Sequence, residues 1–192
     1  MKRMLKKLLI TDPDYYGTAP RFLRNRLART LRHTRPDMIS YRNKSGRSFA
    51  AGARAARHTA KRFGIRSLFI NGSLATAGKL GCGVHLTSTQ HHLIRRAKSL
   101  GLTVLVSTHS KAEIRRCRVA GADFLLYSPV FYVKGKSSPK GLGDLNQITA
   151  TMRAHIIALG GITSEREVAQ IAATKAYGFA SIRYFTDYSQ RK

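Results

Sequence analysis

The chain has 192 residues, 43% of them hydrophobic, which is enough for the core of one domain and too few for two. Its 35 Lys and Arg against 9 Asp and Glu give a formal net charge of +26, and no apolar run approaches the ~20 residues of a membrane span. Cys82 and Cys117 lie far apart without a CxxC pair, which argues against a disulfide scaffold or a zinc site. We expect one domain over residues 1–192, in a reducing cytoplasm.

Short apolar runs rich in β-branched residues alternate with helical patterns along the chain. The first run follows a basic stretch, and we interpret it as a strand because no small-residue cleavage site of a signal peptide follows it. The predicted strands are Leu5–Ile10, Met38–Tyr41, Ser67–Ile70, Val84–Leu86, Thr103–Val106, Phe124–Tyr127, His155–Leu159 and Phe179–Ile182. The predicted helices cover residues 19–33, 48–64, 73–81, 90–101, 111–122, 144–154 and 164–176.

This alternation indicates repeated βα units and therefore a parallel sheet. Eight units are the number that closes a (β/α)8 barrel. An open doubly wound sheet is the alternative, but the sequence has no phosphate-binding fingerprint at a switch point. We predict an α/β protein with a compact (β/α)8 TIM barrel, shortened helices and an eighth helix confined at most to residues 187–192.

In such a barrel the chemistry lies where strands end and the following loops begin. The rule places one group of residues at a common rim: Thr11, Asp12, residues 42–44, Asn71, residues 87–90, residues 107–109, residues 128–140, Gly160, Gly161 and Arg183. Basic, hydroxyl and amide groups dominate this rim, and carboxylates are almost absent. The composition favours an anionic ligand.

Two adjacent glycines, Gly160 and Gly161, end the seventh strand and precede a helix that opens with a capping box from Ser164 to Glu167. Free backbone N–H groups at such a place bind anions, and glycine lets a phosphate come close. Arg183, after the eighth strand, adds a charge-assisted contact. We expect a phosphate here, with Gly161 facing the barrel mouth; the alternative is that the pair only relieves crowding in a tight turn.

The longest loop, residues 128–143, is rich in Gly, Ser, Pro and Lys and is typical of a mobile lid. Arg42 and Lys44 stand two apart at a strand end, so they point the same way and either clamp a diphosphate or face solvent. His109 lies on the rim beside Ser107 and is the histidine that best suits chemistry. His85 alternates with apolar neighbours and is interpreted as a hydrogen-bonded barrel residue.

The positive charge is concentrated, since no acidic residue lies between Asp37 and Glu113. Such a field attracts polyanions and anionic substrates alike. Three interpretations remain open: a solvated helix face, steering of an anionic substrate, and nucleic-acid binding. Aromatic residues are not interleaved with the arginines, which argues against a platform for base stacking.

Several stretches resemble the thiamine phosphate synthase/TenI superfamily. They are "VSTHSKAEIRRCRVAGADFLLYSPVF" at residues 106–131, "IIALGGIT" at 156–163 and, more loosely, "ISYRNK" at 39–44. The resemblance runs from Leu8 to Phe185. It implies a (β/α)8 barrel of thiamine biosynthesis, a transferase that joins hydroxymethylpyrimidine diphosphate to thiazole phosphate and releases pyrophosphate with the help of Mg²⁺.

The resemblance also implies roles for individual residues. Diphosphate contacts would come from Arg42, Lys44, Asn71 and Lys136, and Ser107 would lie beside the pyrimidine and the diphosphate. Gly160 and Gly161 would hold the thiazole phosphate. Together with the rim argument this gives Arg42, Lys44, Lys136 and Ser107 as catalytic candidates, and Asn71, His109, Gly160, Gly161 and Arg183 as substrate-binding candidates.

The chain departs from the family pattern at the positions that hold magnesium. Gly72 and Gln90 replace two aspartates, whereas Mg²⁺ prefers at least one carboxylate. Ser40 replaces a glutamine, and Pro129 stands where the TenI-type tautomerase has histidine. We expect no protein-built metal site, and the alternative to an active transferase is a non-catalytic barrel that binds a phosphorylated ligand or a polyanion.

Overall fold

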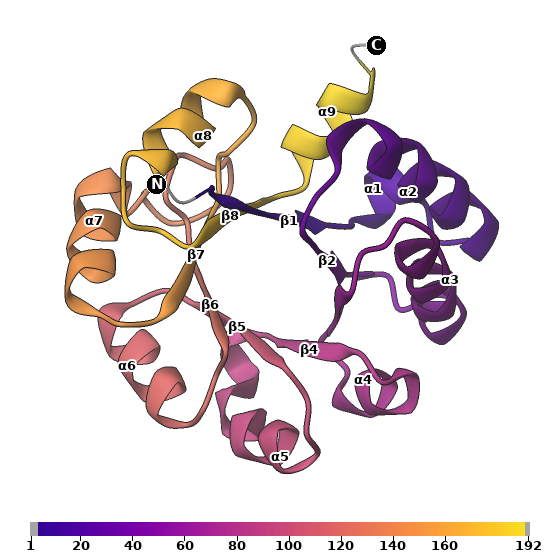
Figure 1. Ribbon diagram of the computed structural model, residues 1–192, viewed down its shortest axis with the longest axis horizontal. Helices are drawn as coiled ribbons and strands as arrows, with labels where there is room; N and C mark the ends of the chain where they lie inside the picture. Colours follow the sequence, from indigo (N-terminus) through magenta and orange to yellow (C-terminus); the bar gives the residue numbers. More distant parts are fainter. Residues whose placement is uncertain (1–3, 191–192) are drawn as a thin grey trace.

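The computed structural model describes residues 4–190, with side chains through residue 186. Eight parallel strands form a closed barrel in chain order, and helices surround it (Figure 1). The strands are β1 (Lys6–Ile10), β2 (Met38–Tyr41), β3 (Ser67–Asn71), β4 (Gly83–Leu86), β5 (Val104–Thr108), β6 (Phe124–Tyr127), β7 (His155–Leu159) and β8 (Gly178–Ser181). The predicted (β/α)8 TIM barrel is confirmed.

The helices follow the strands in turn. They are α1 (Pro13–Tyr16), α2 (Pro20–Thr34), α3 (Phe49–Arg62), α4 (Leu74–Leu80), the 3-10 turn η1 (Ser88–Leu93), α5 (Ile94–Ser99), α6 (Lys111–Val119), α7 (Gly141–Thr151), α8 (Glu165–Ala172) and α9 (Arg183–Gln190). None of the helices in the described part of the chain is long and apolar enough to cross a membrane.

The strands bury both of their faces, which explains their nearly continuous apolar sequences. One set of side chains, including Leu8, Leu105 and Ile157, fills the barrel interior. The alternate set, including Leu9 and Val106, packs outward against the helices. The barrel therefore has a packed centre, and a ligand must bind at one of its ends.

Aromatic side chains fill the amino-terminal end of the barrel. The ring of Phe124 lies 5.9 Å from that of Phe69 and 5.6 Å from that of Tyr177, measured between centroids. His155 stacks on Phe124 at 5.4 Å. Rings at this end leave the carboxyl-terminal end, with its polar rim, as the place for a site.

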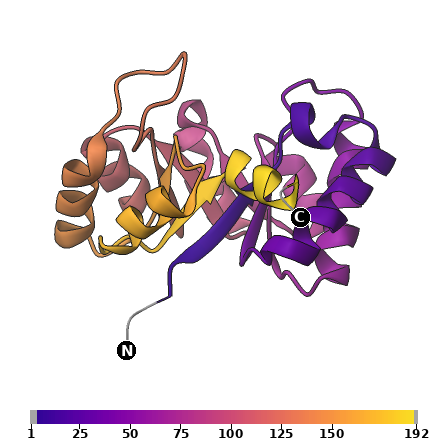
Figure 2. The same ribbon diagram turned by 90° about the horizontal axis from the view of Figure 1, so that it is seen from above.

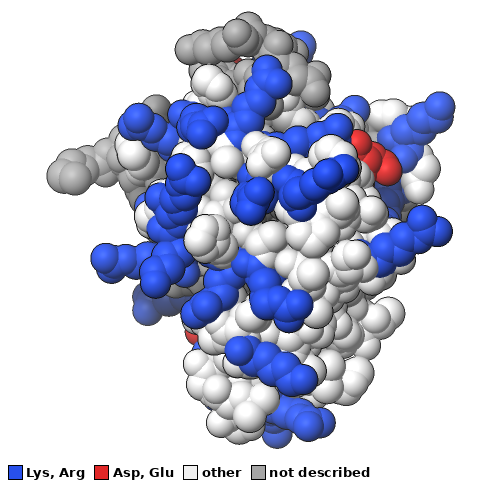
Figure 3. Space-filling view, turned by 90° about the vertical axis from the view of Figure 1, so that its right-hand side faces the viewer, with Lys and Arg blue, Asp and Glu red and all other residues white. Residues whose placement is uncertain are grey.

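Helix α2 shows how one sequence segment serves two surfaces. Leu23, Leu27 and Leu31 recur every four residues and are buried against the barrel. The three arginines between them, Arg24, Arg26 and Arg29, are exposed. Lys and Arg consequently dominate the outer surface of this side of the molecule (Figure 3).

The end of the chain differs from the prediction. Strand β8 stops at Ser181, and helix α9 begins at Arg183 rather than near residue 187. The Ser181 hydroxyl accepts a hydrogen bond from the Tyr184 N–H at 3.2 Å, so it starts a helix directly after the strand. Tyr184 and Phe185 then pack on Phe179, with ring centroids 5.1 and 5.9 Å away. Apolar burial thus starts the helix directly after the strand, at residues that were predicted to lie in the loop.

Candidate functional site

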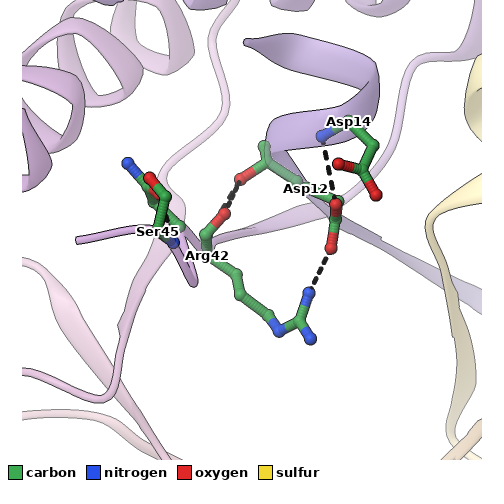
Figure 4. A network of polar contacts seen from close by, with 6 residues as sticks. Asp12, Asp14, Arg42 and Ser45 are labelled. Carbon is green, nitrogen blue, oxygen red and sulfur yellow. Dashed lines mark hydrogen bonds and ion pairs between the residues drawn. The ribbon is translucent and has the colours of Figure 1, made fainter. Parts of the chain in front are cut away.

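Arg42 follows β2 and is held by two neighbours from the end of β1. Its guanidinium forms an ion pair with the Asp12 carboxylate, as seen in Figure 4. The Thr11 hydroxyl accepts from the Arg42 N–H at 2.9 Å and donates to the Arg42 carbonyl at 3.1 Å. Only 19% of the Arg42 side chain and 16% of the Asp12 side chain are exposed. The arginine is therefore fixed in position before any ligand binds.

Lys44 is not placed as we predicted. Strand β2 ends at Tyr41, so the strand alternation that would align Arg42 with Lys44 no longer applies at residue 44. The chain turns here because the Asn43 side chain accepts from the Ser45 N–H at 3.0 Å. Lys44 is exposed, and its side chain is not tied to the Arg42–Asp12 pair.

A buried chain of hydrogen bonds crosses the interior near the carboxyl-terminal end. The Ser40 hydroxyl lies 2.8 Å from Nδ1 of His85, and Nε2 of His85 lies 3.0 Å from the Ser107 hydroxyl. These residues come from β2, β4 and β5. Burial, with a smaller contribution from the Arg42 charge, lowers the pKa of His85 to about 3. The ring is thus neutral at pH 7, so it donates through one nitrogen and accepts through the other.

Asn71 belongs to the same network. Its side-chain amide donates to the His85 carbonyl at 3.2 Å, and the N–H of Gly72 donates to that carbonyl at 2.9 Å. Asn71 is partly exposed at the end of β3. The structure therefore joins Asn71, His85, Ser107 and Ser40 through direct hydrogen bonds.

The two positions where the family has aspartates contact each other. The Gln90 amide nitrogen donates to the Gly72 carbonyl at 3.1 Å, and its oxygen accepts from the Thr87 N–H at 3.1 Å. Neither residue offers a carboxylate, and both ends of the Gln90 amide already have partners. In the described residues no three His, Cys, Asp or Glu side chains form a group that could hold a metal. The residues here do not fit Mg²⁺.

His109 lies on the rim beside the end of β6. Its Nδ1 is 3.0 Å from the Ser128 carbonyl, and its backbone N–H donates to the Glu113 carboxylate at 2.7 Å. The side chain is exposed. It contacts no member of the Ser40–His85–Ser107 chain through a hydrogen bond, so its role as a ligand contact stays a prediction.

The long loop after β6 is anchored at its base. The N–H groups of Val130 and Phe131 donate to the carbonyls of Leu159 and Gly160 at 2.9 and 3.0 Å. Beyond this anchor the chain continues to an exposed turn that contains Lys134 and Lys136. The loop rises above the rest of the barrel in Figure 2. The hydrogen bonds that tie this loop to the end of β7 thus lie at its base and not at Lys136.

The glycine pair after β7 lies against this loop. The φ angles of Gly160 and Gly161 are +101° and +71°, which disfavour any side chain. A Cβ on Gly161 would lie 2.6 Å from the Cβ of Phe131 and 2.7 Å from the carbonyl oxygen of Tyr132. The loop after β6 therefore lies against the side of Gly161 on which a side chain would project. Crowding by the protein's own chain is sufficient to require glycine here.

The backbone N–H groups after β7 and β8 are nevertheless available. Among the described residues, those of Gly161, Ile162, Ile182 and Arg183 donate no hydrogen bond within the protein. The Ser181 hydroxyl donates to the Ile162 carbonyl at 2.6 Å, so the two segments touch. Free N–H groups on adjacent strand ends suit a phosphate. The Arg183 side chain is exposed on α9.

The structure thus brings together part of the predicted site. Ser107 and Asn71 lie on β5 and β3 and Arg42 directly follows β2, each held by hydrogen bonds, whereas Lys44 and Lys136 lie on a turn and a loop. Sequence reasoning missed the pairing of Asp12 with Arg42 and of Ser40 with His85. A carboxylate at a strand end in a chain so poor in acids was the available signal for Asp12.

Comparison with known proteins shows the family to which the chain belongs. The family profile described as thiamine monophosphate synthase matches residues 8–185. The chain belongs to this family. A thiamine-phosphate synthase of Methanoculleus marisnigri is 33% identical over 165 residues, which cover 81% of this chain and 77% of that protein.

Two further comparisons show how much of the chain is similar to known proteins. A relative from Geobacter sulfurreducens is 32% identical over 136 residues, and the match spans 68% of this chain but only 63% of that protein. The solved structure of a thiamine phosphate pyrophosphorylase from Pyrococcus furiosus superimposes with a TM-score of 0.81. It covers 97% of this chain and 94% of that one at 21% identity, which supports the same fold.

Proposed function

We propose that this chain is a thiamine-phosphate synthase, which joins hydroxymethylpyrimidine diphosphate to thiazole phosphate in thiamine biosynthesis. The observation that carries the proposal is Arg42, fixed by Asp12 and Thr11 at the end of β2, the strand that also contributes Ser40 to the hydrogen-bonded chain. A fixed guanidinium suits a diphosphate, and a neutral polar chain suits a pyrimidine. Ser40 on β2 and Arg42 directly after it therefore suit the two parts of hydroxymethylpyrimidine diphosphate, the pyrimidine and the diphosphate.

The reaction needs little acid or base chemistry from the protein. The C–O bond between the pyrimidine methylene and the diphosphate breaks, and pyrophosphate leaves with the electron pair. The ring nitrogen of the thiazole supplies the lone pair that forms the new C–N bond. Arg42 stabilises the negative charge that grows on the leaving group, and Ser107, oriented by His85, contacts the pyrimidine.

The thiazole phosphate would bind after β7 and β8. The N–H groups of Gly161, Ile162, Ile182 and Arg183 are available there, and a phosphate carries several acceptor oxygens. Placing the two substrates at different strand ends of one barrel mouth keeps their phosphate groups apart. It also lets the thiazole ring meet the pyrimidine between them.

Magnesium has no protein ligands at the positions that serve it in the family. Gly72 has no side chain and both ends of the Gln90 amide are already hydrogen-bonded, so these positions cannot replace two carboxylates. The cations must instead come from the chain. Lys44 and Lys136 are exposed lysines, on the turn after β2 and on the loop after β6, and long flexible side chains of this kind suit contact with a bound diphosphate.

The decisive experiment supplies the purified protein with hydroxymethylpyrimidine diphosphate and thiazole phosphate, with Mg²⁺ and with EDTA. Thiamine phosphate and pyrophosphate are quantified together, because the reaction releases one of each. Formation of both products supports the proposal. Absence of product under both conditions, with thiazole phosphate still bound in calorimetry, contradicts catalysis and leaves a phosphate-binding barrel.

A further inference from the structure

Helices α2 and α3 form a surface that the proposed reaction does not use. We call it the α2–α3 face and define it by their exposed cations. Helix α2 contributes five of these and helix α3 four: Arg21, Arg24, Arg26, Arg29, Arg32, Arg54, Arg57, Lys61 and Arg62. Neither helix contains an aspartate or glutamate. Figure 3 looks onto this side of the barrel, where Lys and Arg predominate and little acidic surface is seen.

The charges of this face lack counter-charges. Within the described residues the ion pairs are Lys6–Asp37, Arg42–Asp12, Lys98–Asp123 and Lys111–Asp144. None of these pairs includes a cation of α2 or α3. Clustered cations repel one another, and a self-compensated surface would intersperse acids among them. The face is thus arranged to meet an external anion.

The face lies away from the candidate site. The two helices pack beside each other on the outside of β1–β3 (Figure 1). Their apolar sides, with Leu27 of α2 and Ala53 and Ala56 of α3, are buried against the barrel, so the arginines point outward. A small substrate held at the strand ends has no need of nine cations along the outer helices.

We propose that the α2–α3 face binds the sugar-phosphate backbone of nucleic acid without reading its bases. Eight of the nine cations are arginines, whose planar guanidinium pairs with phosphate through two hydrogen bonds. Phe22, 47% exposed, is the one large apolar side chain exposed on these two helices. A single ring gives no row of aromatics for stacking, so contacts are with phosphates.

The dimensions of the face agree with this partner. The 15 residues of α2 span roughly 22 Å at about 1.5 Å per residue. Duplex DNA carries about one charge per 1.7 Å of axis, so about a dozen phosphates lie within that length. An anionic membrane is a poorer match, because a helix that lies in a membrane surface turns a row of apolar side chains outward, whereas the leucines of α2 are buried and only Phe22 is exposed.

The test measures binding to fluorescein-labelled nucleic acid by anisotropy at several salt concentrations. The probes are a 20-base-pair DNA duplex of arbitrary sequence and an RNA duplex of the same length. We expect binding at about 50 mM salt that falls by 10³-fold or more at about 200 mM, because many phosphate contacts are made at once. Affinity for two unrelated sequences should agree within about 3-fold, since phosphates carry no sequence information.

The variant removes four exposed cations whose side chains form no hydrogen bond or ion pair among the described residues: Arg24→Gln, Arg29→Gln, Arg54→Gln and Lys61→Gln. Its matched control removes four exposed arginines from α5 and α6: Arg95→Gln, Arg96→Gln, Arg115→Gln and Arg118→Gln. Both proteins lose the same net charge. The slope of log K against log[salt] should become shallower by about 3 to 4 in the variant and by less than about 1 in the control.

Equal losses in the two proteins would overturn the proposal, because the total charge alone would then explain binding. No binding of wild type to either probe at about 50 mM salt would overturn it as well. So would binding to vesicles of phosphatidylserine and phosphatidylcholine in preference to both duplexes. Circular dichroism and thiazole-phosphate affinity, unchanged in the variant, show that the fold and the proposed site remain.

Discussion

The side-chain amide of Gln90 donates a hydrogen bond to the backbone carbonyl of Gly72 at 3.1 Å. These are the two positions at which the thiamine monophosphate synthase family resemblance led us to expect aspartates. The bond shows that β3 and β4 still bring the positions together although the carboxylates are gone. The Gln90 amide links the segment after β3 directly to the segment after β4.

Restoring the carboxylates should create a magnesium site. Gly72 has a φ of +76°, and a Cβ there meets no atom within 4 Å, so aspartate is tolerated at about 1 kcal/mol of strain. We expect the Gly72→Asp/Gln90→Asp protein to gain thermal stability when MgCl₂ is added, by about 2.7 kcal/mol at 100 times the dissociation constant. Differential scanning fluorimetry measures the shift, with NaCl of equal ionic strength as control. An equal Mg²⁺-dependent shift in the wild type would contradict our account of the site.

The buried histidine predicts a specific dependence of stability on pH. Burial lowers the pKa of His85 from its usual 6.5 to about 3. Between these values the unfolded chain takes up a proton at this residue and the folded chain does not, so stability falls as the pH falls. His85→Gln keeps a donor and an acceptor without titrating. Urea unfolding between pH 6 and 4 should show the wild type losing about 1.4 kcal/mol per pH unit more than the variant, and parallel curves would refute this.

Arg42 should bind pyrophosphate through its shape as well as its charge. Arg42→Lys keeps the positive charge but loses the planar pair of donors and the geometry held by Asp12. We expect pyrophosphate affinity to fall by roughly 10- to 100-fold, the value of one charge-assisted hydrogen bond. Arg47→Lys, an exposed residue of the same segment, is the matched control and should change affinity by less than about 2-fold. Calorimetry with pyrophosphate decides, and equal effects of the two changes would remove Arg42 from the site.

The barrel could be predicted because its signals are local. Each strand is a short apolar run buried on both faces, and the count of βα units determined the closed form. The site was less accessible because its contacts join distant residues. Asp12 and Arg42 are 30 residues apart, and Ser40 and His85 are 45 apart. The prediction for Lys44 failed because strand alternation was applied beyond Tyr41, where both the predicted strand and β2 end.

The glycine pair after β7 also shows the difference between a local signal in the sequence and a contact between distant residues. The sequence of residues 155–163 indicated that something comes close to the backbone after β7, and this is confirmed. It did not show that the neighbour is the protein's own segment at Phe131 and Tyr132. That approach depends on hydrogen bonds from Val130 and Phe131 to the end of β7, which no local pattern encodes.

Substitution of Gly161 should therefore act mainly on stability. Gly161→Ala places a Cβ 2.6 Å from the Cβ of Phe131 on a backbone with φ of +71°, so both the loop and the backbone must shift. We expect a loss of about 1–3 kcal/mol in urea unfolding. Gly143→Ala is the matched control, because Gly143 lies in α7 with nothing within 4 Å of the added Cβ. It should be neutral or stabilising by up to about 1 kcal/mol.

Measurements of thiazole-phosphate affinity distinguish the two possible roles of Gly161, which are to make room for the loop and to bind the phosphate. If the N–H groups of Gly161 and Ile162 hold the thiazole phosphate, the backbone shift in Gly161→Ala also lowers affinity by about 10-fold or more, while Gly143→Ala leaves it unchanged. Calorimetry is carried out below the unfolding transition of the variant, so that only folded protein is titrated. Wild-type affinity in a destabilised Gly161→Ala protein would mean that the glycine accommodates Phe131 and Tyr132 and that the phosphate binds elsewhere.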